Sequence, residues 1–130
     1  SLAEIDEPIL KVTIGYAEHQ TNHFIQAAKQ ALGSAAHVTT SGYGSVDIVA
    51  PDVNKANGIK VLADYYGVTA DQSLVAFGDG LNDAEMLALA AQPYAMKNGD
   101  DSLLERYPAA LDDNNNDGVL LTLDEILRKQ

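Results

Sequence analysis

The sequence predicts an α/β fold in which helices alternate with short strands, and two observations carry this prediction. The run Leu74–Phe77 is uniformly apolar and is cut off by Gly78, as expected of a strand buried on both faces of a parallel sheet. Good helix formers follow from Ala84 onward, and similar strand and helix patterns alternate along the chain on both sides of this segment.

The first 50 residues are expected to form a β-α-β-β unit. Their apolar residues alternate in one segment, recur at helical spacing in the next, and then fill two short runs joined by the glycine-containing hairpin loop SGYGS. In chain order these elements are a strand at Ile9–Tyr16, a helix at Glu18–Leu32, and strands at His37–Thr40 and Val46–Ala50.

After Pro51 the pattern changes to helix–strand alternation, which predicts a parallel sheet. The expected helices are Asn54–Tyr66, closed by Gly67, one starting at Asn82 or Asp83 and ending before Pro93, Asp100–Arg106, and one ending near Arg128. The expected strands are Leu74–Phe77, Pro93–Lys97 and Ala109–Asp112.

Composition limits the classes of function. The chain has 130 residues, of which 46% are hydrophobic and 21% charged, as in an ordinary globular domain. Its formal net charge of −11 argues against nucleic acid or an anionic membrane as a partner, because both would be repelled. It has no cysteine, no apolar run of membrane-spanning length and no secretory signal pattern, so we expect a cytoplasmic protein.

The segment VAFGDGLNDAEML is the main candidate for a site. Asp79 follows Gly78, the glycine that ends the buried strand, and so lies at the strand end where α/β proteins bind ligands. Asp79 and Asp83 are four residues apart, so one helical turn could bring both carboxylates to one side, with the Asn82 amide beside them. Such oxygen ligands suit Mg²⁺. The alternative is that both aspartates only cap the helix and that Gly80 only makes the turn.

Lys55 stands at the start of an expected helix, where the helix dipole disfavours a cation and favours an anion. One interpretation is that Lys55 reaches a bound phosphate that the helix N-terminus also faces. Taken alone, a solvated lysine is the commoner explanation.

Four segments together resemble a known family: NKANGIKVLADYYGV, VAFGDGLNDAEMLALA, PYAMKNGDD and NNNDGVLLTLDEIL. In order and spacing they are similar to the C-terminal part of the Cof-type haloacid dehalogenase-like hydrolases, which are mostly Mg²⁺-dependent phosphatases. The resemblance covers Pro51–Leu127 strongly. It implies that residues 51–130 are the C-terminal half of a Rossmann-like hydrolase core, and that residues 1–50 are the second half of the inserted α/β cap.

The resemblance also implies roles for individual residues. Lys55 would neutralise the phosphoryl group and the aspartyl-phosphate intermediate, and Asp79 would be a direct Mg²⁺ ligand. Asp83 would support the metal site, and Asn82 would hydrogen-bond the phosphoryl oxygens. Asn98 would contribute to phosphate binding, although Lys97–Gly99 reads Lys-Asn-Gly where the family usually has Gly-Asn-Ala.

The family's nucleophile is missing from this chain. In this family a DxDx(T/V) motif supplies the nucleophilic aspartate. The motif has no match in this chain, since no Asp-x-Asp occurs before residue 50. Transfer of a phosphoryl group to a carboxylate requires that carboxylate in line with the phosphorus. We therefore expect a fragment that is inactive alone, from a parent that hydrolyses phosphate monoesters of sugars or other small metabolites. An isolated half sheet would expose a strand edge and apolar surface, so self-association of the fragment is also expected.

Two alternatives belong to other classes of function. One is a complete, non-catalytic binding or assembly module with a vestigial half-site. The other is a calcium-binding loop, because Asp113, Asn115 and Asp117 match the first half of an EF-hand loop and Asp124 takes its twelfth position. The residues before that loop do not favour the required incoming helix, and the family resemblance instead makes Asp117 the cap of the last helix.

Three further residues carry weaker hypotheses. His19 and His23 have a metal-compatible spacing on a helix, but no acidic third ligand is evident and a solvated face is favoured. Tyr43, in the hairpin loop, is a candidate cap contact with substrate.

Overall fold

The computed structural model describes residue 4 and residues 6–129, and it divides into two compact units between Val53 and Asn54. Each unit has its own sheet and its own cluster of buried apolar side chains.

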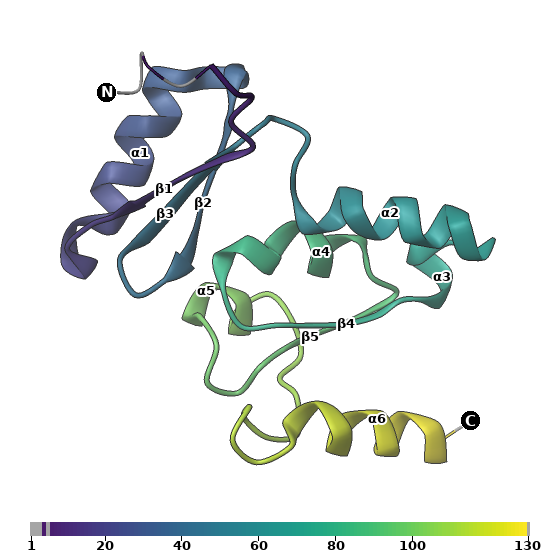
Figure 1. Cartoon of the computed structure of the whole chain (residues 1–130). Coiled ribbons are helices and arrows are strands. Elements are labelled where there is room, and N and C mark those ends of the chain that lie inside the picture. The colour runs from purple at the N-terminus through teal and green to yellow at the C-terminus, as the bar shows by residue number, and fades with distance from the viewer. Residues whose placement is uncertain (1–3, 5, 130) are drawn as a thin grey trace. The chain divides into compact units, whose positions relative to one another are not determined.

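The first unit is a β-α-β-β arrangement, as predicted (Figure 1). Its sheet is antiparallel, with the strands in the order β1-β3-β2. Ile25 of the helix is buried against Val38 and Val46 of the sheet, so the apolar stripe of the helix and one face of the sheet make the core. The elements are β1 (Lys11–Gly15), α1 (Thr21–Leu32), β2 (His37–Gly42) and β3 (Ser45–Val49).

A tight two-residue turn joins β2 and β3. Tyr43 and Gly44 both have positive φ, at 50° and 75°, which is the backbone pattern of a type I′ hairpin turn. Gly44 lies against the end of β1: its carbonyl accepts a hydrogen bond from the Tyr16 N–H at 2.7 Å, and a Cβ on Gly44 would lie 2.1 Å from the Tyr16 carbonyl oxygen. The tip is therefore held on one side, whereas the Tyr43 side chain is 97% exposed.

The second unit contains a parallel pair of strands covered by helices (Figure 1). Ala76, Leu87, Ala95 and Leu103 are its buried apolar cluster. Ala95 also pairs in parallel with Ala109, which continues the sheet by one bridge. The elements are α2 (Lys55–Tyr66), α3 (Ala70–Ser73), β4 (Val75–Gly78), α4 (Ala84–Leu89), β5 (Gln92–Ala95), α5 (Asp101–Leu104) and α6 (Gly118–Arg128).

Local chemistry sets the ends of α2. The Asn54 side chain accepts a hydrogen bond from the Asn57 N–H at 2.8 Å, which caps the first turn. At the other end Gly67 takes the left-handed conformation, with φ 67°, and closes the helix. Lys55 is thereby fixed as the first residue of α2.

Several short elements differ from the sequence predictions. The predicted strand Ala109–Asp112 is reduced to one bridge at Ala109, and the helix predicted at Asp100–Arg106 is only α5, since Pro108 stops further helix. The strand predicted at Pro93–Lys97 ends at Ala95, because the chain turns there and the Gly99 N–H bonds back to the Met96 carbonyl at 2.8 Å. The short helix α3 was not predicted.

Asp117 is the N-cap residue of α6, as predicted, but it does not cap the helix through its side chain. Asp117 precedes α6 with φ 54°, in the left-handed region, and its side chain makes no capping hydrogen bond. The tight turn is enforced instead at Gly118, where a Cβ would lie 1.9 Å from the Asp112 carbonyl oxygen.

No helix among the described residues is both long enough and apolar enough to cross a membrane.

Candidate active site

A pocket of about 520 Å³ lies in the second unit at the carboxyl end of β4. That end of a parallel strand is where α/β folds place their ligands. The pocket is lined by Lys55 at the start of α2, Phe77, Gly78 and Asp79 at the end of β4, Asp83, Met86, Met96, and Asn114 and Asp117–Leu120 around the start of α6.

Asp83 is the most constrained polar residue of this pocket. It is only 3% exposed, and its carboxylate pairs with the Lys55 ammonium. Its second oxygen accepts hydrogen bonds from the N–H groups of Asp79, at 2.9 Å, and Gly80, at 3.2 Å. Gly78 leaves the necessary room, since a Cβ there would lie 2.6 Å from the Asp83 Cβ. The aspartate therefore joins the start of α2 to the turn after β4.

These contacts keep Asp83 ionised. Burial acts to raise the pKa of the Asp83 carboxyl, but the hydrogen bond from Lys55 and those from the Asp79 and Gly80 N–H groups outweigh burial and lower it below its usual value. Lys55 and Asp83 thus face the pocket as a charged pair.

Asp79 is held through its backbone rather than through its side chain. Its carbonyl accepts a hydrogen bond from the Asp100 N–H at 2.8 Å, and Gly99 packs so closely that a Cβ would lie 3.1 Å from the Asp79 Cα. Among the described residues no group donates a hydrogen bond to the Asp79 carboxylate, which lines the pocket beside the Lys55–Asp83 pair. This carboxylate is free to accept a ligand.

The structure brings Lys55, Asp79 and Asp83 together, but it places the two predicted asparagines differently. Asn82 does not line the pocket, and its Oδ1 lies over Gly80, 2.9 Å from where a Cβ of that glycine would be. Asn98 also lies outside the lining. Its amide donates to Asn114 Oδ1 at 2.7 Å.

The segment before α6 contributes to the pocket, which the sequence did not predict. Asn114 and Asp117 line the pocket, and Gly118 brings the first turn of the helix to its rim. The signal in the sequence is the NNNDG string, which by itself predicts only a turn or the first half of a calcium-binding loop.

The loop at residues 112–117 is arranged as a turn. Asp113 Oδ1 accepts hydrogen bonds from the Asn115 N–H and the Asn116 amide, both at 2.9 Å. Asp124, the twelfth position of the proposed EF-hand loop, pairs with Arg128 on α6 at 2.7 Å. The chain enters the loop from the bridge at Ala109 and not from a helix.

His19 and His23 are both exposed. No set of three or more histidine, cysteine, aspartate or glutamate side chains gathers as a metal site within the described part of the chain.

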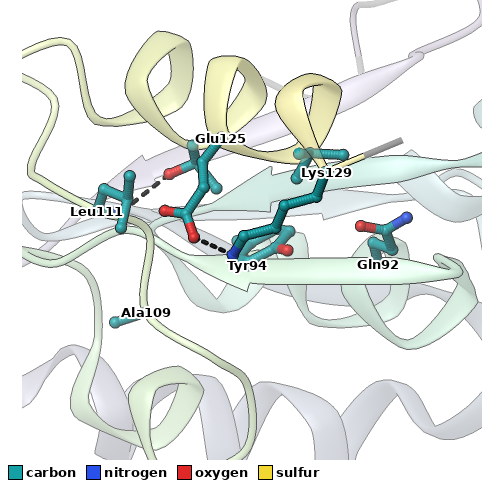
Figure 2. A pocket seen from close by; sticks show the side chains of 8 residues that line it. Gln92, Tyr94, Ala109, Leu111, Glu125 and Lys129 are labelled. Atoms are coloured by element: carbon teal, nitrogen blue, oxygen red, sulfur yellow. Dashed lines mark hydrogen bonds and ion pairs between the residues drawn. The ribbon is translucent and has the colours of Figure 1, made fainter.

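A second pocket, of about 460 Å³, lies between α6 and β5. Its side chains include Tyr94, Gln92 and the neighbouring Glu125 and Lys129, which pair with each other (Figure 2). Thr122 and Leu111 also line this pocket, and the Thr122 hydroxyl accepts a hydrogen bond from the Leu111 N–H at 2.9 Å. None of the predicted site residues lines this pocket, and its one charged pair is neutralised internally.

A parallel α/β unit with a lysine–aspartate pair and a second aspartate at the carboxyl end of a strand is an α/β protein with the arrangement of a ligand-binding site. The sequence model of the haloacid dehalogenase-like hydrolase family matches residues 1–123, and the chain belongs to that family.

Individual relatives agree with this family. The chain is 35% identical over 105 residues to 5-amino-6-(5-phospho-D-ribitylamino)uracil phosphatase YbjI of Escherichia coli, a match that covers 81% of this chain and 38% of the relative. It is 37% identical over 79 residues to HMP-PP phosphatase of Cronobacter sakazakii, which covers 61% of this chain and 29% of the relative.

The fold also matches a solved structure. The structure of SMU.1108c from Streptococcus mutans superposes with a TM-score of 0.86 at 30% identity, covering 98% of this chain and 48% of that one. The chain therefore spans less than half the length of these relatives.

Proposed function

We propose that this chain supplies half of the active site of a Mg²⁺-dependent phosphatase that hydrolyses small phosphate monoesters through an aspartyl-phosphate. The observation that carries the proposal is the convergence of Lys55, Asp83 and Asp79 on one pocket at the end of β4. The pocket offers a cation for a phosphoryl group and, beside it, a carboxylate with no hydrogen-bond donor among the described residues.

Lys55 is the residue that meets the phosphoryl charge. Its side chain lines the pocket and is half-exposed, and the Asp83 carboxylate pairs with its ammonium group. Because Asp83 also accepts two backbone hydrogen bonds, its carboxylate cannot move away without breaking these partly buried bonds. Asp83 therefore positions Lys55, and Lys55 stabilises negative charge on the phosphoryl group and on the aspartyl-phosphate.

The donors present suit Mg²⁺. This cation takes oxygen ligands, keeps several waters, and is commonly held by one or two carboxylates together with a substrate phosphate. Asp79 would be its direct ligand and Asp83 would support the site. Such a site does not require a cluster of three acidic side chains. When bound, the ion would neutralise phosphoryl oxygens and help to align the group for in-line attack.

The nucleophile has to come from residues that this chain does not contain, and the free edge of β4 indicates where they would enter. The carbonyls of Leu74 and Gly78 bond toward β5, to Gln92 and Met96. Backbone groups of successive residues in a strand point to opposite sides, so the N–H and C=O groups of Val75 and Phe77 point away from β5. Among the described residues no strand pairs with β4 on that side. A strand added in parallel there would end beside Asp79.

The substrate class we propose is a small phosphorylated metabolite, including sugar phosphates. Relatives that cover part of this chain are phosphatases named for phosphoribitylaminouracil and for HMP-PP, both of them small phosphorylated molecules. A net charge of −11 is compatible with such ligands because Lys55 and a bound cation meet the phosphate charge locally.

Mg²⁺ titration of the chain followed by calorimetry or NMR tests the site. Asp79→Asn should weaken Mg²⁺ binding by at least about tenfold, since it removes a charged ligand. Asp71→Asn, at an exposed position on α3, is the matched control and should leave binding unchanged. Equal affinities of the wild type and Asp79→Asn would refute the assignment of Asp79 as the metal ligand.

A further inference from the structure

Asn98 and Asn114 form a paired contact between the loop after β5 and the loop before α6. Asn98 Nδ2 donates to Asn114 Oδ1 at 2.7 Å, and the Asn114 backbone N–H donates to Asn98 Oδ1 at 3.4 Å. The same two loops are joined by Lys97, whose ammonium donates to the Leu111 carbonyl at 3.1 Å. Asn114 is therefore held from a neighbouring loop.

The backbone N–H settles the orientation of both amides. A backbone N–H can only donate, so the Asn98 atom that faces it must be the oxygen, and the other Asn98 atom must be the NH₂ group. The Asn114 atom that accepts from this NH₂ must in turn be its oxygen. The NH₂ group of Asn114 is thus on the side of its amide away from Asn98.

The two asparagines consequently differ in what they can offer a ligand. Both polar atoms of Asn98 are engaged with Asn114, and Asn98 does not line the pocket. Asn114 does line it, with Lys55 and Asp79, and its NH₂ group has no acceptor among the described residues.

We propose that Asn114 is a phosphate-binding residue, which donates a hydrogen bond from Nδ2 to a phosphoryl oxygen in the pocket, and that Asn98 is its positioning residue. This inference rests on the proposed function, because the phosphoryl group is the one that Lys55 meets. It assigns Asn98 an effect on phosphate binding that passes through Asn114.

The test is titration of the chain with inorganic phosphate in the presence of Mg²⁺, followed by ¹H–¹⁵N NMR of the side-chain amides. In the wild type the Asn114 NH₂ signals should shift with added phosphate. Asn114→Asp keeps the oxygen that accepts from Asn98 but removes the donor, so phosphate affinity should fall at least about tenfold. Asn115→Asp adds the same charge one residue along the loop, outside the pocket lining, and should have a much smaller effect.

Asn98→Asp tests the positioning role without changing the pocket lining. The new carboxylate at residue 98 can only accept hydrogen bonds, so the Asn114 amide must rotate and donate its NH₂ group to that carboxylate. The oxygen of Asn114 then faces the pocket in place of its NH₂ group. Phosphate affinity should fall about as much as in Asn114→Asp, while the melting temperature changes little. A purely structural role would instead lower the melting temperature and leave the phosphate affinity of the folded fraction unchanged.

The outcomes separate this inference from the proposed function. If Lys55→Ala abolishes phosphate binding while Asn114→Asp and Asn115→Asp bind equally well, the phosphate site stands and the role of Asn114 is refuted. If the wild type does not bind phosphate, or Lys55→Ala binds as well as the wild type, the proposed phosphate site itself is refuted, and the role of Asn114 with it.

Discussion

Asp83 makes the stability of the second unit depend on pH. Its carboxyl pKa is lowered in the folded chain, so its contribution is fully present above the unfolded value of 3.8 and is lost as pH falls through the lower folded value. We expect the free energy of unfolding to decrease on acidification below about pH 4 by this route. Urea unfolding at pH 3 and pH 6 measures the effect.

Asp83→Asn provides the comparison for that pH dependence. It removes the ion pair with Lys55 and should cost about 1–3 kcal/mol at neutral pH, because a buried charge-assisted hydrogen bond is lost. The acid-induced loss of stability should also be smaller in this variant. An unchanged slope of stability against pH would show that other carboxyl groups control the acid transition.

Gly118 is required by close backbone packing rather than by helix chemistry. Gly118→Ala would place a Cβ 1.9 Å from the Asp112 carbonyl oxygen, and rigid backbone would have to move. We expect a loss of more than about 2 kcal/mol in the free energy of unfolding, as for severe overpacking.

Gly58→Ala is the matched control for this substitution. Gly58 lies inside α2, and no heavy atom lies within 4 Å of the position of its Cβ. Alanine there should stabilise the chain by about 0.5–1 kcal/mol. If chemical denaturation showed the two alanine variants to be equally stable, the packing explanation for Gly118 would fail.

The site residues that are close in sequence, Asp79 and Asp83, were predictable, but side-chain contacts between residues far apart in sequence were not. Asp79 and Asp83 follow a buried apolar run within a few residues, so their meeting at one pocket could be inferred from the sequence. The contact between Asn98 and Asn114 joins residues 16 apart and depends on how two irregular loops fold, which carries no periodic signal.

Among the elements, the β2–β3 hairpin carries a residue that its turn does not favour. A type I′ turn needs positive φ at both central residues, and Asn-Gly is the preferred pair, but the chain has Tyr43-Gly44. Tyr43→Asn should therefore raise the free energy of unfolding by about 0.5–1 kcal/mol, because asparagine adopts left-handed backbone at lower cost. Thermal unfolding of the chain measures this.

Gly44→Ala in the same turn should have the opposite effect. Its Cβ would lie 2.1 Å from the Tyr16 carbonyl oxygen, so the hairpin tip would have to separate from the end of β1. A Tyr43→Asn variant less stable than the wild type would indicate that the exposed tyrosine ring makes a stabilising contact within the chain.

Long, periodic elements were predicted well, and short ones were not. α1 and α2 have apolar residues at helical spacing and glycines that end them, so their presence and their C-terminal ends follow from sequence. α1 begins at Thr21, three residues after the expected start at Glu18, because residues 18–20 form a 3₁₀ turn. The four-residue helices α3 and α5 and the single bridge at Ala109 have too few residues for periodicity, and tertiary contacts decide them.

For the whole molecule, the second unit leaves apolar surface uncovered. Leu120 and Leu127 on α6 are 65% and 67% exposed, Tyr66 on α2 is 72% exposed, and one edge of β4 is unpaired among the described residues. We expect concentration-dependent self-association of the chain, because exposed edges and apolar patches pair readily.

Light scattering across a wide concentration range tests this expectation. The double variant Leu120→Lys and Leu127→Lys should shift the equilibrium toward monomer, whereas Leu10→Lys, an exposed leucine of the first unit, should not. A wild-type chain that stays monomeric at all concentrations would contradict the expectation.

The most direct test of the central proposal is phosphatase activity of the chain alone and of the chain extended by any coding sequence found upstream of Ser1. With Mg²⁺ and p-nitrophenyl phosphate, the chain alone should show no turnover. The extended protein should contain a DxDx(T/V) strand, turn over substrate, and lose activity by at least about a thousandfold in Lys55→Ala or Asp79→Asn. Turnover by the chain alone, or full activity of the extended Lys55→Ala protein, would contradict the proposal.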